Sequence, residues 1–254
     1  MKKLILASAI SAAFVGGFAQ AEEAAPPEEH VVAYNVGIAS QYRYRGISQS
    51  QKDPAFSFGA DYTNNPTGLY VGTWISTIKW VKDAGGDGNS EVDVYAGQRG
   101  QISADVTYDV GVLTYYYPSN KLQSSTVGTY ANANSTEVYG QIGMGPFYLK
   151  YSHAVTNLFG SVDSANSYYI DAGANIDVAD KTQLNLHVGR QHLAGTANTT
   201  GSYTDWKIGV TKDFGFAIGA LYAVGTNADQ TFYTFGTKGY MGGTAGVVTL
   251  TKTF

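Results

Sequence analysis

The sequence keeps a two-residue alternation of apolar and polar side chains up to its last residue. The final stretch, Gly246 to Phe254, places Val248, Leu250 and Phe254 on one face. Strict alternation of this kind predicts a β-strand. A final strand exposes an edge that other chains could pair with, and closure of the sheet into a barrel removes every edge. We therefore expect this strand to pair with the first strand of the chain.

The same alternation recurs along the chain and predicts twelve strands. Most are close to the 9–11 residues that a tilted strand needs to cross the hydrocarbon core of a membrane, whereas strands of soluble sandwiches are usually shorter, about 5–6 residues. The first predicted strand starts near residue 31 and has Arg43 and Arg45 on its polar face. The others are 54–63, 69–78, 90–99, 102–116, 136–143, 146–156, 167–178, 182–193, 202–212, 215–225 and 243–254. Because residues 231–235 also alternate, the boundaries between 202 and 243 stay open.

The connections between these strands alternate in length. The short ones are 64–68, 100–101, 144–145, 179–181 and 213–214, and the long ones are 46–53, 79–89, 117–135, 157–166, 194–201 and 226–242. Bacterial outer-membrane barrels have short periplasmic turns and longer external loops, and a Greek-key sandwich has no reason for such regularity. The fold class expected is all-β, a transmembrane up-and-down antiparallel β-barrel of about twelve strands, with both chain ends on the periplasmic side.

The first residues have the features of a secretory signal. Lys2 and Lys3 precede an apolar run, and Ala19-Gln20-Ala21 has the form of a signal-peptidase site. We expect residues 1–21 to be a signal peptide, 22–30 a flexible acidic periplasmic lead, and 31–254 a single barrel domain. The sequence after residue 21 contains no run of 18 or more apolar residues, so it predicts no membrane-spanning helix.

Composition restricts the partners and the covalent chemistry. Loss of residues 1–21 leaves 14 basic residues against 20 acidic ones, a formal charge of −6, which disfavours nucleic acid as a partner. The chain has no cysteine, although an exported protein could form disulfides. With 31 Gly and 20 Tyr, the composition suits strands better than helices, and it is also compatible with a soluble secreted β-protein.

The polar faces of the strands define a predicted lumen. The charged residues predicted to line it are Arg43, Arg45, Asp61, Glu91, Asp93, Asp109, Glu137, Asp171 and Asp205, and the aromatic residues are Tyr70, Trp74, Tyr95 and Tyr115. We expect Arg43 and Arg45 to reach the external end of the first strand, at the level of Glu91 and Asp93. The opposed charges could select solutes, with an excess of acid that favours cations, or they could pair and brace the wall. The aromatic rings could stack on ligands or fill the bore.

Motifs for catalysis, metals and cofactors are missing from the sequence. It has four histidines but neither a Gly-x-Ser-x-Gly elbow nor a His-Glu-x-x-His motif. The glycine-rich stretch 85–89, with Asp83 before it, lacks the Lys-Ser/Thr of a phosphate loop and the glutamate of a calcium loop. We expect no catalytic residue, no metal and no cofactor.

Several segments resemble the TorF-type porin family. They are Ser40 to Ser50, Pro54 to Phe56, Gly59 to Tyr62, Gly68 to Ser76, Glu91 to Gly97 and the closing Lys252-Thr253-Phe254. The resemblance spans the mature chain and implies an outer-membrane barrel of a Gram-negative bacterium that acts as a porin, without indicating a substrate. Leu250 and Phe254 also resemble the terminal signal by which such barrels are handed to the barrel-assembly machinery.

The function expected is a porin-like channel for passive diffusion of small hydrophilic solutes, with a mild preference for cations. Its expected partners are outer-membrane lipid and lipopolysaccharide, the assembly machinery and the solutes themselves. A bore of twelve strands lies between the filled interior of eight strands and the aqueous channel of 16 to 18. The alternative is a closed barrel with a structural or surface-interaction role, which wall side chains that occlude the bore would favour.

Overall fold

The computed structural model describes residues 28–254. The predicted signal peptide and residues 22–27 of the predicted lead lie outside the described residues. Within residues 28–254, no helix has both the length and the apolar character needed to cross a membrane.

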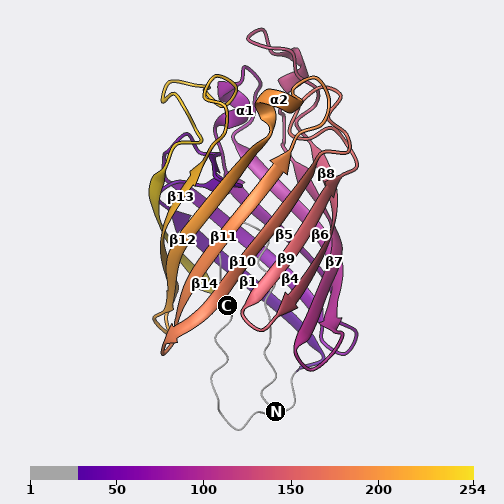
Figure 1. Cartoon of the computed structure of the whole chain (residues 1–254), viewed down its shortest axis with the longest axis vertical. Helices are drawn as coiled ribbons and strands as arrows, with labels where there is room; N and C mark the ends of the chain where they lie inside the picture. Colours follow the sequence, from indigo (N-terminus) through magenta and orange to yellow (C-terminus); the bar gives the residue numbers. More distant parts are fainter. Residues whose placement is uncertain (1–27) are drawn as a thin grey trace.

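Twelve antiparallel strands form a closed barrel, as predicted (Figure 1). They are β1 (His30–Ala39), β4 (Ala55–Asn64), β5 (Leu69–Thr77), β6 (Ser90–Gln101), β7 (Val106–Tyr116), β8 (Ser135–Met144), β9 (Phe147–Ala154), β10 (Tyr168–Ala179), β11 (Thr182–His192), β12 (Tyr203–Asp213), β13 (Ile218–Thr226) and β14 (Ala245–Thr253). Each strand pairs with its neighbours in sequence order. The barrel sheet therefore has up-and-down topology.

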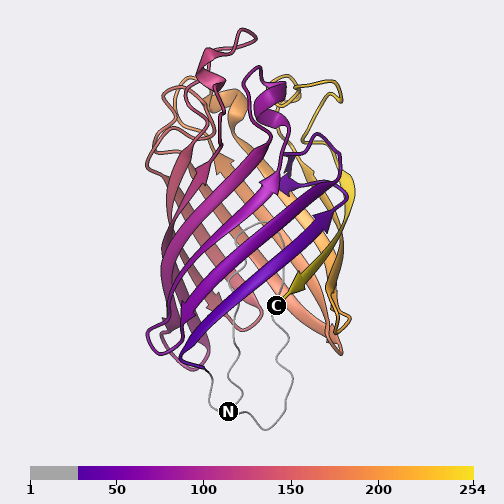
Figure 2. The same cartoon turned by 180° about the vertical axis from the view of Figure 1, so that it is seen from behind.

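The first and last strands close the barrel. β1 pairs with β14 from Asn35 opposite Thr253 to Ala39 opposite Thr249, and the two strands lie side by side in Figure 2. One residue further, the Phe254 backbone N–H donates to the Tyr34 carbonyl at 2.8 Å, and the Tyr34 N–H donates to the Phe254 carbonyl at 3.2 Å. The predicted pairing of the last strand with the first is confirmed.

Long loops and tight turns lie at opposite ends of the barrel (Figures 1 and 2). The loop end carries three short helical segments, α1 (Trp80–Asp83), the 3₁₀ segment η1 (Leu122–Ser124) and α2 (Asn198–Gly201). Residues 227–244 form a loop with one isolated bridge between Thr234 and Tyr240, so the alternation at 231–235 does not extend a strand.

The outer surface of the barrel is apolar. Trp206, Ile208 and Val210 of β12 are exposed, while Asp205, which alternates with them, is buried. A soluble sandwich would bury the apolar face, because the hydrophobic effect removes such area from water. An apolar face turned outward and a polar face turned inward is the pattern of a strand in a membrane barrel.

The prediction that the first strand continues through Arg45 is wrong. β1 ends at Ala39, and β4 begins at Ala55 as the direct antiparallel partner of Ala39. The chain between them folds into the lumen as a small hairpin, β2 (Arg43–Tyr44) and β3 (Ile47–Ser48). We call residues 40–52 the plug.

A tight turn shapes the plug. Arg45 and Gly46 have φ values of 45° and 78°, as the two central residues of a type I′ hairpin turn require. Glycine adopts this conformation without cost, whereas it is uncommon for arginine. If the first strand continued beyond the barrel, its charged side chains would be exposed to water. The turn instead places them inside the lumen, next to polar partners.

Candidate functional site

The tip of the plug is fixed to the opposite wall through Arg45. Its Nη2 atom lies 2.7 Å from Glu137 Oε2 on β8, and its Nη1 donates to Glu137 Oε1 at 3.0 Å and to Gln191 Oε1 on β11 at 2.8 Å. Its guanidinium also stacks over the ring of Tyr169 on β10, 4.3 Å from the ring centroid. Arg45 thus connects the plug to three strands of the wall.

Tyrosines of the plug make a second set of contacts. The Tyr42 hydroxyl donates to Glu91 Oε1 at 2.6 Å, and the Tyr117 hydroxyl donates to Glu91 Oε2 at 2.7 Å. The Tyr44 and Tyr115 hydroxyls are hydrogen-bonded to each other. Burial, reinforced by the charge of Glu91, raises the pKa of Tyr42 well above its ordinary value, so its hydroxyl stays a donor.

Arg43 does not join the predicted cluster of arginines and carboxylates. Its Nη1 donates to the carbonyls of Gly46 and Gly243, each at 2.8 Å, and its Nε donates to Gln41 Oε1 at 2.9 Å. Because it belongs to the plug and not to β1, its guanidinium caps backbone carbonyls within the plug and the loop before β14.

Asp93 is a buried carboxylate of the wall beside this cluster. It is 2 % exposed, and its Oδ1 atom has no hydrogen-bond partner among the described residues. Glu91 lies two positions away on the same inward face of β6, so the plug covers two neighbouring carboxylates. An unpaired buried carboxylate is unfavourable, since burial removes its water without replacing it.

A histidine bridges two of the predicted lumen carboxylates. His187 Nδ1 lies 2.7 Å from Asp171 Oδ1, and its Nε2 lies 3.1 Å from Asp205 Oδ1. The Tyr169 hydroxyl also donates to Asp205. No motif spacing links His187 to these carboxylates. The strand register does, because Gly189 lies opposite both Asp171 and Asp205 and His187 is two residues away on the same face of β11. The absent side chain of Gly189 leaves room for the Tyr169 hydroxyl.

The remaining predicted lumen residues also form pairs. The Tyr95 hydroxyl donates to Asp61 Oδ1 at 2.5 Å, and the Tyr70 hydroxyl donates to Asp109 Oδ1 at 2.5 Å. Trp74 packs edge-on against Tyr42 of the plug, with ring centroids 5.2 Å apart. The aromatic residues therefore act mainly as hydrogen-bond donors and packing surfaces.

The two predicted assembly residues face outward. Leu250 and Phe254 are both exposed on the outer surface of the seam. Within residues 28–254, no group of three or more His, Cys, Asp or Glu side chains is placed to hold a metal ion.

Comparisons with known proteins identify a family and a fold. The model of the Gcw_chp family, a bacterial protein family of unknown function, matches residues 21–254. No curated protein sequence matches the chain. A structure solved in a study of in-meso crystallization of membrane proteins resembles it with a TM-score of 0.50 and 8% identity, over 88% of this chain and 83% of that chain. At this identity the likeness concerns the fold alone.

Two further solved structures are similar at lower TM-scores. LpxR from Salmonella typhimurium has a TM-score of 0.43 and 9% identity, with 87% of this chain and 99% of that chain covered. The outer membrane protein OprD from Pseudomonas aeruginosa has a TM-score of 0.41 and 9% identity, with 88% of this chain and 64% of that chain covered.

Proposed function

We propose that this chain, which belongs to the bacterial Gcw_chp family, is a porin-like outer-membrane channel for small hydrophilic solutes. We also propose that the plug closes this channel. The resemblance to TorF-type porins supports the same function. We assign no catalytic residue and propose that the protein is not an enzyme.

The observation that carries this proposal is that the plug shares no strand pairing with the barrel wall. The hairpin β2–β3 forms a sheet of its own, and β1 pairs with β4 directly beneath it. The plug is held by side-chain contacts such as those of Arg45 and Tyr42 and by backbone hydrogen bonds to loops, such as that from Ser48 to Met241. It can therefore leave the lumen without breaking a strand pair of the barrel. A plug that leaves the lumen in this way acts as a gate.

The polar lumen wall supports the passage of polar solutes. It is lined by paired polar groups, among them Asp61 with Tyr95, Asp109 with Tyr70, and His187 with Asp171 and Asp205. Hydrated solutes cross such a wall more easily than an apolar one. The predicted lumen carboxylates outnumber the predicted lumen arginines, which favours a mild cation preference.

The location that we propose is the bacterial outer membrane, with both chain ends on the periplasmic side and the long loops outside. Outer-membrane barrels place short turns in the periplasm and long loops outside. The expected partners are lipopolysaccharide and other lipids of that membrane, and the barrel-assembly machinery, which would read Leu250 and Phe254.

Liposome swelling tests this function. Protein reconstituted in liposomes should admit small sugars and amino acids faster when residues 40–54 are replaced by a four-residue Gly-Ser turn, which the direct pairing of Ala39 with Ala55 permits. The rate should fall as the solutes become larger. A folded plug-free variant that admits no solute would disprove the channel.

Cation preference has its own measurement. The plug-free variant, placed between two KCl concentrations in a planar bilayer, should give a reversal potential of cationic sign. A reversal potential near zero or of anionic sign would contradict the cation preference but not the channel function.

A permanently closed barrel with a structural or surface-interaction role is the second candidate. The burial of the Arg45–Glu137 pair and of the Tyr44–Tyr115 contact favours it, because such contacts hold the plug tightly. It predicts that removing the plug leaves the loops' binding partners unchanged and that the wild-type protein stays shut under every applied voltage.

A further inference from the structure

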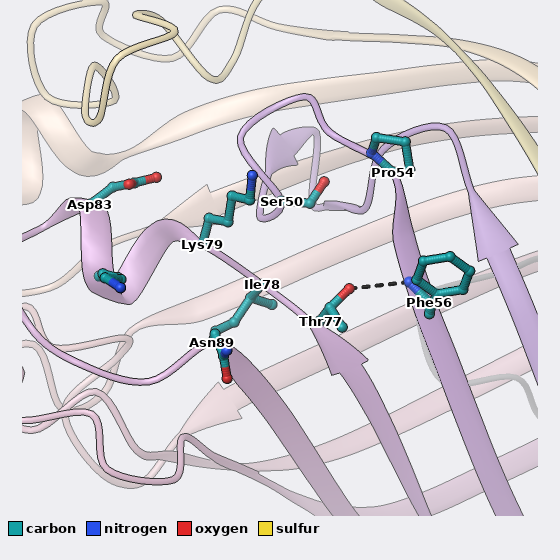
Figure 3. Close-up of a pocket in the computed structure, with 9 residues that line it drawn as sticks. Ser50, Pro54, Phe56, Thr77, Ile78, Lys79, Asp83 and Asn89 are labelled. Atoms are coloured by element: carbon teal, nitrogen blue, oxygen red, sulfur yellow. Dashed lines mark hydrogen bonds between the residues drawn. The ribbon is translucent and has the colours of Figure 1, made fainter.

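A pocket of about 450 Å³ opens beside the ends of β4 and β5, at the loop end of the barrel (Figure 3). Pro54 and Phe56 line it from the β4 side, and Thr77 and Lys79 from the β5 side. The pocket also includes residues of α1. It is separate from the lumen network, since it contains none of the paired carboxylates there.

The pocket exists because the two strands separate before they end. Backbone pairing between β4 and β5 begins only at Ser57 opposite Ser76. Above that pair, the Phe56 backbone N–H donates to Thr77 Oγ1 at 3.1 Å instead of to a strand carbonyl (Figure 3). The strand ends diverge from there and leave a cleft between them.

Positive charge gathers around this cleft. Lys79 Nζ lies 2.6 Å from Asp53 Oδ2, and Lys238 binds the other oxygen of Asp53. Lys82, on α1, is exposed, and its side chain makes no hydrogen bond or ion pair with any described residue. Lys52 contacts the backbone of Lys238. Lys79 and Lys82 thus line the pocket together with Asp83, and Lys52 and Lys238 lie beside it at Asp53, in a chain whose formal net charge is −4.

An apolar surface continues from the mouth of the cleft. Phe56 is 62% exposed, and Phe58 follows it on the same outward face of β4. This face belongs to the apolar outer surface of the barrel. The pocket therefore joins a cationic rim to the surface that lipid chains would cover.

We propose that this pocket binds the phosphate-bearing head group of an anionic lipid of the external leaflet, with Lys82 and Lys79 facing the phosphate and the acyl chains lying over Phe56 and Phe58. A lysine ammonium binds phosphate as a point charge, and a basic cluster at a membrane surface attracts anionic head groups. The proposal rests on a lipid-facing barrel, and it holds whether or not the lumen conducts.

Asp83 lies where it would repel the bound phosphate, so replacing Asp83 should have the opposite effect on binding to replacing Lys82. Its side chain lines the pocket, and its Oδ2 atom is buried without a hydrogen-bond partner among the described residues. A carboxylate there repels a phosphate. Its removal should therefore strengthen binding, whereas loss of Lys82 should weaken it.

Native mass spectrometry of the refolded protein in a zwitterionic detergent, titrated with bisphosphorylated lipid A, tests the site. Lys82→Gln should weaken binding about five-fold, the effect of one lysine near an anionic lipid surface. Asp83→Asn should tighten it a few-fold. Lys181→Gln, which removes a lysine in the turn between β10 and β11 at the other end of the barrel, is the matched control and should bind as the wild type does.

Three results would overturn the proposal. One is equal lipid A affinity for Lys82→Gln, Asp83→Asn and Lys181→Gln when each variant shows the heat-dependent gel mobility of a folded barrel. Another is displacement of lipid A by millimolar inorganic phosphate, which would show a simple phosphate site without a lipid. Binding of phosphatidylcholine as strong as that of lipid A would also contradict a site for anionic head groups.

Discussion

Arg45 and Glu137 are separated by 92 residues in sequence, yet the Arg45 guanidinium donates to both oxygens of the Glu137 carboxylate, at 2.7 and 3.0 Å. The two side chains are 5% and 1% exposed. One belongs to the plug and the other to the wall strand β8. Their contact is therefore the clearest link between the plug and the wall.

Replacing Arg45 by Gln should destabilise the folded barrel. Glu137 would remain buried without its counter-charge, and breaking one side of a buried pair costs about 3–5 kcal/mol. Urea unfolding in lipid vesicles, followed by gel mobility, measures the change. Arg190→Gln is the control and should change stability little, since this exposed arginine contacts only Thr204 among residues 28–254, at 3.4 Å. Equal stabilities of the two variants would contradict this reading of the pair.

Replacing Gly46 by Val should expel the tip of the plug. A Cβ atom there would lie 2.3 Å from Thr226 Cγ2 and 2.8 Å from Asp205 Cβ, in a backbone with φ of 78°. Limited trypsin digestion of the folded protein should then cleave at Arg43 or Arg45, which are buried in the wild type. Gly215→Val, in a turn with φ of 83° and open space around it, carries the same backbone strain without the clash. Cleavage in both variants or in neither would argue against a sterically fixed tip.

Deleting Phe254 should reduce assembly into the membrane. The deletion removes the two backbone hydrogen bonds to Tyr34 and the outward aromatic ring at the seam. The heat-modifiable fraction in isolated outer membranes should drop several-fold. Phe147→Ala removes another exposed outward aromatic ring without touching the seam, and it should assemble normally. Normal assembly without Phe254 would remove its proposed role as an assembly signal.

A charge on the outer face should be costly only at the level of the lipid. Ile208, in the middle of β12, is exposed on that face, and lysine there should cost about 2–4 kcal/mol of folding free energy in bilayers. Ile102, also exposed, lies in the turn after β6, where lysine should cost little. Refolding titrations in phosphatidylcholine vesicles compare the two. Similar costs at both positions would mean that this face does not meet lipid.

The barrel could be predicted from the sequence because its signals are local and repeated. Each strand shows its faces through alternation, and Phe254 marks the strand that pairs with β1. The plug could not be predicted, because residues 41–45 keep the same alternation while a single turn at Arg45 and Gly46 reverses the chain. Contacts such as Arg45 with Glu137 join distant segments, and no spacing in the sequence encodes them.

The wall contacts were partly accessible to prediction. The inward position of Asp171 and Asp205 follows from alternation alone. Their bridge through His187 requires the register of three strands, which alternation does not supply. Arg43 illustrates the same limit, since its partners are backbone carbonyls of the plug and of the loop before β14.

Single-channel recording of the wild-type protein beside the variant that lacks residues 40–54 tests the gated channel most directly. Both proteins are first shown to be folded by their gel mobility. A plugged channel predicts long closed periods for the wild type and stable, larger conductance steps for the variant. A folded variant that stays as silent as the wild type would contradict the channel and leave the closed barrel, and a wild type that conducts as well as the variant would contradict the plug.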